Sequence, residues 1–286
     1  MKEILRIIYY KILSFLPAKI VINIENIKAY RRLFNKKDVK YFGEKIQYLK
    51  LYGNLEKYNE YVDKYLVRKY VSNKIGEKYL IPLIGNYSIP EEIYYPNFPQ
   101  KFVLKLNHGS GYNIIIKEKK KINTKKINKK LNKWLKEDYY KIKKEYQYKN
   151  VKKKIICEEF ISDKNNELLD YKFFCFNGKP KFVKVDFDRF KDHKVNFYDM
   201  NWKFIEMQEA GWKNYFGKVE KPKNFELMIE IATKLCKDFQ FVRVDLYNIE
   251  GKIYFGELTF TPASGRHPFL PLEKDEEIAK EIQINE

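Results

Sequence analysis

Two acidic residues near the C-terminal end of the chain have the spacing and surroundings of metal ligands. Asp245 lies in the apolar run 241–247 and Glu257 in the apolar run 254–260, with an Asn-Ile-Glu-Gly turn signal at 248–251. An unpaired carboxylate in an apolar run is costly, so each acid is expected to have a partner. Magnesium bound to a nucleoside triphosphate suits such a pair, because it keeps waters and phosphate oxygens and takes only one or two protein carboxylates.

Arg243 and Thr259 extend this set. Arg243 stands two positions before Asp245, and Thr259 stands two positions after Glu257, so strand alternation places each on the face of its neighbouring acid. A guanidinium, two carboxylates and a hydroxyl could form the phosphate-transfer end of an ATP-dependent enzyme. The alternative is an ordinary hairpin whose acids pair with lysines across the sheet.

A lysine ahead of a glycine loop forms a second candidate set. Lys105 lies in the short apolar strand 102–106, and a second strand is expected at 113–117. Between them lies the loop Asn107-His108-Gly109-Ser110-Gly111. We predict that Lys105 binds phosphate, that backbone N–H groups of the loop cradle phosphate oxygens, and that His108 binds rather than catalyses. The alternative is an edge-strand lysine facing water beside a hairpin turn.

Further charged residues lie on the strands that follow. Glu158 and Glu159 end an expected strand at 154–160, and only one of them can enter a given cleft because adjacent residues alternate faces. That acid could accept hydrogen bonds from an adenine amino group or a ribose hydroxyl, or it could pair with a surface lysine. Lys184 and Asp186 could line an anionic substrate site, although surface pairing is the commoner role of charged residues.

The composition favours a globular protein with anionic partners. The chain has 286 residues, of which 44% are hydrophobic and 17% aromatic, and its formal net charge is +19. This composition can build a substantial core and excludes a disordered chain. The charge favours nucleotides, phosphorylated carriers, acidic glycans or anionic lipid. We do not expect nucleic acid, because no arginine-rich stripe or recognised motif accompanies the charge.

The cysteines and the N-terminal segment indicate where in the cell the protein is expected. Cys157, Cys175 and Cys236 fit neither a zinc site nor a redox CxxC motif, so buried free thiols and a reducing compartment are expected. Residues 1–16 are apolar but too interrupted by charge for a transmembrane span, and they lack a cleavage site of the secretory type. They form either a basic amphipathic helix on a membrane surface or a helix packed on the body or on a partner.

The order of the predicted elements indicates an α+β protein with more than one sheet. Residues 1–75 have helical periodicity, and a lysine-rich helical segment is expected at 122–148. An Asn-Gly hairpin signal at 177–178 joins two strands, and a helix is expected at 225–237. A short polar tail is expected after the last strands.

Taken in this order, these landmarks resemble the ATP-grasp superfamily, and within it the TupA-like branch associated with bacterial surface-polysaccharide genes. The resemblance covers roughly residues 50–268. The segments that carry it are 63–68, 102–111, 156–161, 170–180, 243–245 and 256–265.

The resemblance implies an ATP-grasp fold in which two α+β lobes clamp ATP, preceded by a helical N-terminal region. Residues 1–50 would form that region, associated with a membrane or a partner. Residues 51–286 would form the catalytic region, with an N-terminal part at about 51–100, a central lobe at about 101–157 and a C-terminal lobe at about 158–286.

The resemblance also implies roles for the site residues. Lys105 would contact the nucleotide phosphates under the 107–111 loop, and Arg243 would stabilise charge on the transferred phosphoryl group or the tetrahedral intermediate. Magnesium would be held by Asp245, Glu257 and Thr259, although many ATP-grasp ligases have asparagine where this chain has Thr259. The remaining nucleotide contacts would be Glu158, Glu159, Phe160, Ile161, Lys172 and, for the ribose by approximate spacing only, Glu167.

The implied activity is an ATP-dependent, ADP-forming carboxylate–amine ligase in surface polysaccharide or glycopeptide biosynthesis, with ATP and Mg2+ as cofactors. Its substrates would be small or glycan-linked carboxylates and amines, and its location the cytoplasm or the inner face of the membrane. Two alternatives stay open. One is a kinase that phosphorylates a sugar or glycan hydroxyl, and the other is a non-catalytic, membrane-associated binding protein.

Overall fold

The computed structural model describes residues 2–163, 168–187 and 192–284 and consists of two compact units. The first unit combines Met1–Asn54 with Asp163–Glu286, and the second is Leu55–Ser162. Each unit has its own sheet and its own hydrophobic core. With 39% helix and 24% strand, the chain has the mixed class and the helical N-terminal region that the sequence predicts.

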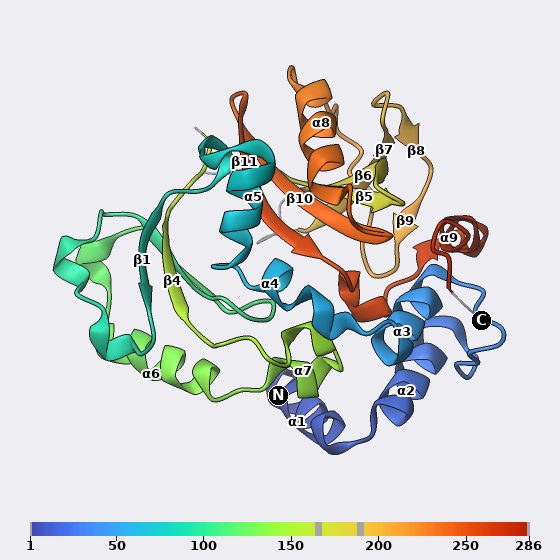
Figure 1. The fold of residues 1–286 in the computed structure, drawn as a ribbon, viewed down its shortest axis with the longest axis horizontal. Coiled ribbons are helices and arrows are strands. Elements are labelled where there is room, and N and C mark those ends of the chain that lie inside the picture. The colour runs from blue at the N-terminus through green and yellow to red at the C-terminus, as the bar shows by residue number, and fades with distance from the viewer. Residues whose placement is uncertain (1, 164–167, 188–191, 285–286) are drawn as a thin grey trace. The chain divides into compact units, whose positions relative to one another are not determined.

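The first unit holds most of the strands (Figure 1). Its helices are α1 (Lys2–Phe15), α2 (Ala18–Tyr30), α3 (Phe42–Tyr52), α8 (Phe225–Cys236) and α9 (Leu272–Ala279). Its strands are β5 (Asp170–Phe176), β6 (Lys179–Phe187), β7 (Lys194–Asp199), β8 (Phe204–Ile205), β9 (Gln208–Glu209), β10 (Phe241–Ile249), β11 (Lys252–Thr259) and β12 (Phe269–Leu270). A 3₁₀ turn, η7 (Pro262–Gly265), follows β11.

The second unit contains one antiparallel sheet in the order β1-β4-β2-β3. Its strands are β1 (Leu83–Tyr87), β2 (Phe102–Leu106), β3 (Asn113–Ile116) and β4 (Ile155–Glu159). Its helices are α4 (Asn59–Val62), α5 (Val67–Ile75), α6 (Thr124–Leu135) and α7 (Tyr139–Lys143).

Alternation along β2 gives the four-stranded sheet one apolar face. Phe102, Leu104 and Leu106 are fully buried and belong to the same core cluster as Ile127 and Leu131 of α6. The lysines of α6 are exposed, as expected for an amphipathic helix that packs on a sheet. The residues between these core positions, including Lys105, therefore point to the other face.

The first unit is built on a six-stranded antiparallel sheet in the order β11-β10-β5-β6-β7-β8. Helix α8 covers one face (Figure 1), where Phe225 stacks on Phe173 of β5 with ring centroids 5.9 Å apart. The apolar residues of α8 recur at helical spacing, so its buried stripe, Met228, Ile231 and Leu235, matches this face.

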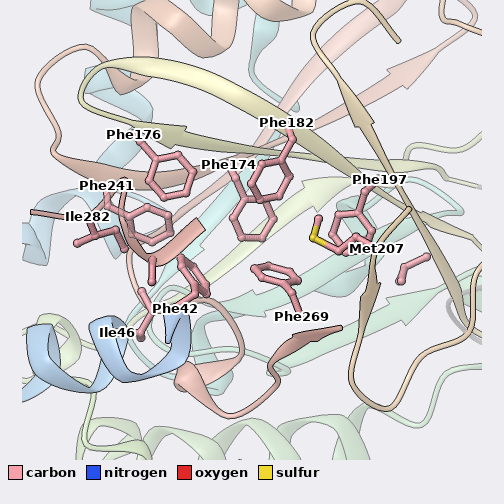
Figure 2. Packing of buried hydrophobic residues seen from close by; sticks show 12 residues of the cluster. Phe42, Ile46, Phe174, Phe176, Phe182, Phe197, Met207, Phe241, Phe269 and Ile282 are labelled. Carbon is pink, nitrogen blue, oxygen red and sulfur yellow. The ribbon is translucent and has the colours of Figure 1, made fainter. Parts of the chain in front are cut away.

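The opposite face of this sheet carries a cluster of phenylalanines (Figure 2). Strands β5, β6, β7 and β10 contribute Phe174, Phe176, Phe182, Phe197 and Phe241. Helix α3 contributes Phe42 and Ile46, and β12 contributes Phe269 (Figure 2). Residues from both ends of the sequence therefore complete one core, which ties the N-terminal helices to the sheet.

Several predicted elements are confirmed. Strand β2 occupies the predicted range, and α8 lies within the predicted 225–237 helix. Asn177 and Gly178 form the predicted hairpin turn between β5 and β6, with φ values of 50° and 74°. All three cysteines are buried free thiols, as expected.

Two predictions of elements are wrong. The expected polar tail contains α9, because Ala279 and Ile282 are buried in the phenylalanine core while Glu273 and Glu277 are exposed. The lysine-rich segment 122–148 is not one helix. It breaks after Leu135 into α6, α7 and a 3₁₀ turn, although neither glycine nor proline marks the break.

Candidate active site

Lys105 lies at the centre of the four-stranded sheet. Strand β2 pairs with β3 on one side and β4 on the other, so the alternative of an edge-strand lysine is wrong. The Lys105 Nζ lies 2.6 Å from Oε2 of Glu158, whose Oε1 lies 3.1 Å from Nη1 of Arg68. Glu158 therefore matches the charge of Lys105, whose side chain is 19% exposed.

The glycine loop after Lys105 is anchored by the Asp63-Lys64 pair. Asn107 Nδ2 donates to Oδ2 of Asp63 at 2.7 Å, and Lys64 Nζ donates to the carbonyl oxygen of Gly109 at 2.6 Å. Position 109 requires glycine for two reasons: its φ is +74°, and a Cβ there would lie 2.7 Å from the Tyr139 ring. The loop is therefore held at its base, while Ser110 and Gly111 are exposed at its tip.

The other nucleotide contacts predicted in this unit occupy different environments. Glu158 is buried on the Lys105 side, whereas Glu159 is exposed, so alternation separates the two acids as expected. Phe160 and Ile161 are half-buried just beyond β4. Burial, followed by the nearby lysines, lowers the pKa of His108 to about 4, so its imidazole is neutral at neutral pH. A phosphate contact from His108 would therefore be a neutral hydrogen bond.

The six-stranded sheet brings Arg243, Asp245 and Lys172 together on one face. Lys172 is the register partner of Asp245 in the β5–β10 pair. Arg243 grips the Asp245 carboxylate with Nε and Nη2, both at 2.7 Å, and Lys172 Nζ lies 2.8 Å from Asp245 Oδ2. Burial alone would raise the pKa of Asp245, but the two cations outweigh it and hold that pKa below its usual value.

Arg243, Asp245 and Lys172 begin a row of charged side chains, which continues across β6 toward β9. Lys172 also contacts Asp170 and lies 3.5 Å from Asp186 Oδ2. Lys184 is the register partner of Lys172, and its Nζ lies 3.4 Å from Asp186 Oδ1 and 2.5 Å from Glu209 Oε2. The residues of this row in β5, β6 and β10 are buried, so the surface-pairing alternative is wrong for Lys184 and Asp186.

Glu257 and Thr259 complete the set from β11. Thr259 Oγ1 accepts from Arg243 Nη2 at 3.1 Å and donates to Glu257 Oε1 at 3.1 Å. A bulge at Gly256 makes this arrangement possible, since the pairing shifts there so that Glu257 stands opposite Asp245. A Cβ on Gly256 would lie 3.0 Å from the Asp245 carbonyl oxygen, which explains the glycine.

The donor set fits a magnesium–nucleotide complex. Counted over the described residues, the row holds five carboxylates and three cationic side chains, an excess of two negative charges that one divalent ion would offset. Glu257 is 37% exposed and would be the accessible ligand, whereas Asp245 is already bound by Arg243 and Lys172. No group of three or more His, Cys, Asp or Glu side chains able to hold a metal by themselves occurs in the described part of the chain.

The sequence did not predict several residues that lie beside Lys105 or in the charged row of the six-stranded sheet. Asp63, Lys64 and Arg68 belong to a segment that carries the family resemblance, yet none was predicted as a site residue. Glu209 lies in a two-residue strand for which the sequence offers no signal. The predicted ribose ligand Glu167 lies outside the described residues.

Comparisons with known proteins place these residues in a family. The model of the TupA-like ATPgrasp family matches residues 44–283. Among solved structures, the chain is similar to D-alanine–D-alanine ligase from Bacillus anthracis. The two are 17% identical with a TM-score of 0.47, and the match covers 81% of this chain and 68% of that one. The same enzyme from Helicobacter pylori is 18% identical with a TM-score of 0.39, over 78% of this chain and 60% of that one.

A third structure is the ADP complex of purK, N5-carboxyaminoimidazole ribonucleotide synthetase. It is 10% identical with a TM-score of 0.41, over 71% of this chain and 46% of that one. No curated protein is a significant match to the chain. The assignment depends on the family model alone, which spans most of the chain and includes every described site residue named above. The protein therefore belongs to the TupA-like ATP-grasp family, within a superfamily of ATP-dependent carboxylate–amine ligases.

Proposed function

We propose that this protein joins a carboxylate to an amine in an amide bond at the expense of ATP. A carboxylate oxygen attacks the γ-phosphorus of ATP, and the bond from that phosphorus to the β-phosphate oxygen breaks. The products of this step are ADP and an acylphosphate. The amine nitrogen then attacks the acyl carbon, inorganic phosphate leaves, and the nitrogen loses a proton. The observation that carries this proposal is the Arg243–Asp245–Glu257 set, with its excess negative charge beside a guanidinium.

The two sets of residues would serve the same nucleotide. Lys105 and the backbone of the 107–111 loop would bind phosphate oxygens. Glu257, with Asp245, would hold a magnesium ion that offsets charge on the β- and γ-phosphates. Arg243 would stabilise the negative charge that develops during both attacks, and it is already held by Asp245 and needs no reorganisation. No protein nucleophile is required.

The substrates we propose are a uronic acid or an amino acid and an amine, used in bacterial surface polysaccharide or glycopeptide assembly. The association of the TupA-like branch with surface-polysaccharide genes supports this choice. The net charge of +19 is compatible with an acidic substrate.

The N-terminal helices also carry a candidate membrane surface. No helix among the described residues is long and apolar enough to cross a bilayer. At the junction of α1 and α2, however, Ile12, Phe15 and Ile20 are 56%, 81% and 47% exposed, with the exposed Lys11 and Lys19 beside them. We propose that this patch contacts an anionic leaflet. Co-sedimentation with phosphatidylserine vesicles should be strong for the intact chain and lost in Ile12→Ser/Phe15→Ser.

The ligase proposal is tested by product analysis. The protein is incubated with Mg-ATP and a panel of amino acids and uronic acids, and ADP, phosphate and product masses are measured. A ligase releases free phosphate with a product whose mass equals the two substrates less one water. A stable phosphoester without free phosphate would identify a kinase and contradict the proposal.

A further inference from the structure

The turn that follows the Glu257–Thr259 strand end has a backbone that few sequences adopt. Ala263, Ser264 and Gly265 of η7 all have positive φ, at 49°, 58° and 69°. Two of these are not glycine, so the left-handed conformation is strained there and persists only when the surroundings impose it.

The surroundings that impose it come from helices at the other end of the sequence. Lys50 Nζ of α3 donates to Ser264 Oγ at 3.0 Å and to the Ser264 carbonyl oxygen at 3.3 Å. Gln47 Nε2 donates to the same carbonyl at 3.1 Å and to that of Gly265 at 3.3 Å. Two side chains one turn apart on α3 thus hold successive carbonyls of the turn.

Glu25 of α2 anchors these donors. Its Oε2 lies 3.6 Å from Lys50 Nζ and accepts from Gln47 Nε2 at 3.4 Å. The Lys50 side chain is fully buried and that of Glu25 is 4% exposed, so the pair is desolvated and geometrically specific. Glu25 precedes the segment 44–283 that matches the family model, so this anchor is a feature of the chain beyond that match.

The backbones themselves also meet. A Cβ on Gly265 would lie 2.8 Å from the Gly43 carbonyl oxygen, and a Cβ on Gly43 would lie 2.7 Å from the Gly265 carbonyl oxygen. From α1, Tyr10 accepts a hydrogen bond from Arg266 Nη1 at 2.7 Å. Helix α3 therefore contacts the turn directly, whereas α1 and α2 contact Arg266 just after it, α2 through Glu25 Oε1 at 3.8 Å from Arg266 Nε.

We propose that Glu25 and Lys50 are positioning residues, which hold residues 261–267 so that the end of β11 presents Glu257 and Thr259 correctly to the nucleotide. The inference rests on the proposed function for its catalytic consequence. Its structural part, that the N-terminal helices fix the turn, stands on the contacts alone. On this proposal the N-terminal helices help to position the residues that bind the nucleotide.

The test uses the full-length double variant Glu25→Gln/Lys50→Met, which removes both buried charges together and so leaves neither unpaired. We expect a melting temperature near that of the wild type and amide exchange at 261–267 faster by about tenfold. We also expect kcat for ADP formation to fall by roughly ten- to a hundredfold while KM for Mg-ATP changes less than about twofold, because misplacement by about 1 Å has effects of this size. The matched control is Lys40→Met, which breaks the exposed Lys40–Glu276 pair between the N-terminal segment and α9 and should change none of these.

Unchanged exchange and unchanged kcat in a folded double variant would overturn the proposal, as would a loss of kcat matched by an equal loss of Mg-ATP affinity. If the double variant does not fold, Ser264→Ala removes only the hydroxyl that accepts from Lys50 and should shift exchange and kcat in the same direction, more weakly. A wild type that turns over no ATP with any substrate of the panel would count against the proposed function, whereas amide exchange at 261–267 would still decide whether Glu25 and Lys50 fix the turn.

Discussion

The two ends of one face of the six-stranded sheet show opposite ways to fill a buried space. At one end, phenylalanines from four strands pack against α3 and β12 (Figure 2). At the other end, Lys172, Asp245 and Arg243 occupy positions of the same strands and satisfy one another with ion pairs. On β5 the change happens within two residues, from Lys172 to Phe174.

Buried aspartates at the two ends respond to these surroundings in opposite directions. Asp245 lies between two cations, which hold its pKa below the usual value against the effect of burial. Asp275 lies beside the phenylalanines and accepts hydrogen bonds from the backbone N–H groups of Phe42 and Phe269, but no ion pair joins it to another described residue. Burial raises its pKa to about 6. The charged form of the carboxylate is therefore favoured by folding at the first end and disfavoured by folding at the second.

The largest predicted effect separates activity from stability at the charged end. Glu257→Gln should lower ATP turnover on the order of a thousandfold, because it removes the carboxylate that we propose as the accessible ligand of the divalent ion. The melting temperature should stay near that of the wild type, since the side chain is 37% exposed. Turnover in steady-state assays and calorimetric melting check this, and normal turnover would remove Glu257 from the site.

Asp245→Asn should behave differently from Glu257→Gln. It removes the buried carboxylate that Arg243 grips with two nitrogens, and leaves Arg243 only the longer ion pair with Glu257 at 3.4 Å, so we expect a stability loss of about 3–5 kcal/mol in addition to lost turnover. Urea unfolding of both variants measures the contrast. Equal stability of the two would contradict the ion-pair description.

The aromatic end should show the reverse pattern. Phe176→Ala removes a side chain that is 1% exposed and contacts Phe42, Phe182 and Phe241, so it should cost about 3–5 kcal/mol. The turnover of the molecules that remain folded should be near that of the wild type. A specific loss of kcat at full folding would show that the two ends are not separable.

A smaller effect is expected at the bulge that orients Glu257. Gly256→Ala adds a Cβ 3.0 Å from the Asp245 carbonyl oxygen, so the β10–β11 pair must shift by a few tenths of an ångström. We expect turnover to fall by about tenfold with a stability loss of about 1 kcal/mol. Gly251→Ala is a poor control because that residue has positive φ. Tyr254→Phe, elsewhere on β11, is the better control and should match the wild type.

The last predicted effect concerns stability alone and is a pH dependence at Asp275. Its folded pKa of about 6 exceeds the unfolded value of 3.8, so its favourable contribution to stability is complete below pH 3.8 and is lost as pH rises through 6. The stability of the wild type relative to Asp275→Asn should therefore fall by about 2–3 kcal/mol between pH 4 and pH 8. Urea unfolding across this range measures the difference, and a constant difference would place the cause elsewhere.

The sequence predicted the charged end better than the aromatic end. Asp245, Glu257, Arg243 and Lys172 were identifiable because charged residues in apolar strands require partners, whatever the tertiary structure. The partners of the phenylalanines were not identifiable. Helices α3 and α9 come from the two ends of the chain, and nothing local in 272–279 indicates what it packs against.

The bulges explain why even the charged end could not be fully derived. Counting outward from the turn at 249–252, regular pairing would set Glu257 opposite Val244 and on the wrong face of the sheet. The shift in pairing at Gly256 instead places Glu257 opposite Asp245, on the same face as the other charged residues. A second shift between Phe174 and Cys175 sets Lys172 opposite Lys184. A shift of one residue costs little locally and is fixed by packing across the whole sheet, which no short segment of sequence reveals.

We propose that Glu257 holds the magnesium ion of a bound nucleotide and that Lys105 binds its phosphates. Calorimetric titration of ATP, with and without Mg2+, into the wild type, Lys105→Ala and Glu257→Gln tests it most directly. We predict that the wild type binds more tightly with Mg2+, that Glu257→Gln loses this dependence, and that Lys105→Ala weakens binding under both conditions. Wild-type affinity in both variants, with Mg2+ dependence intact, would contradict the claim.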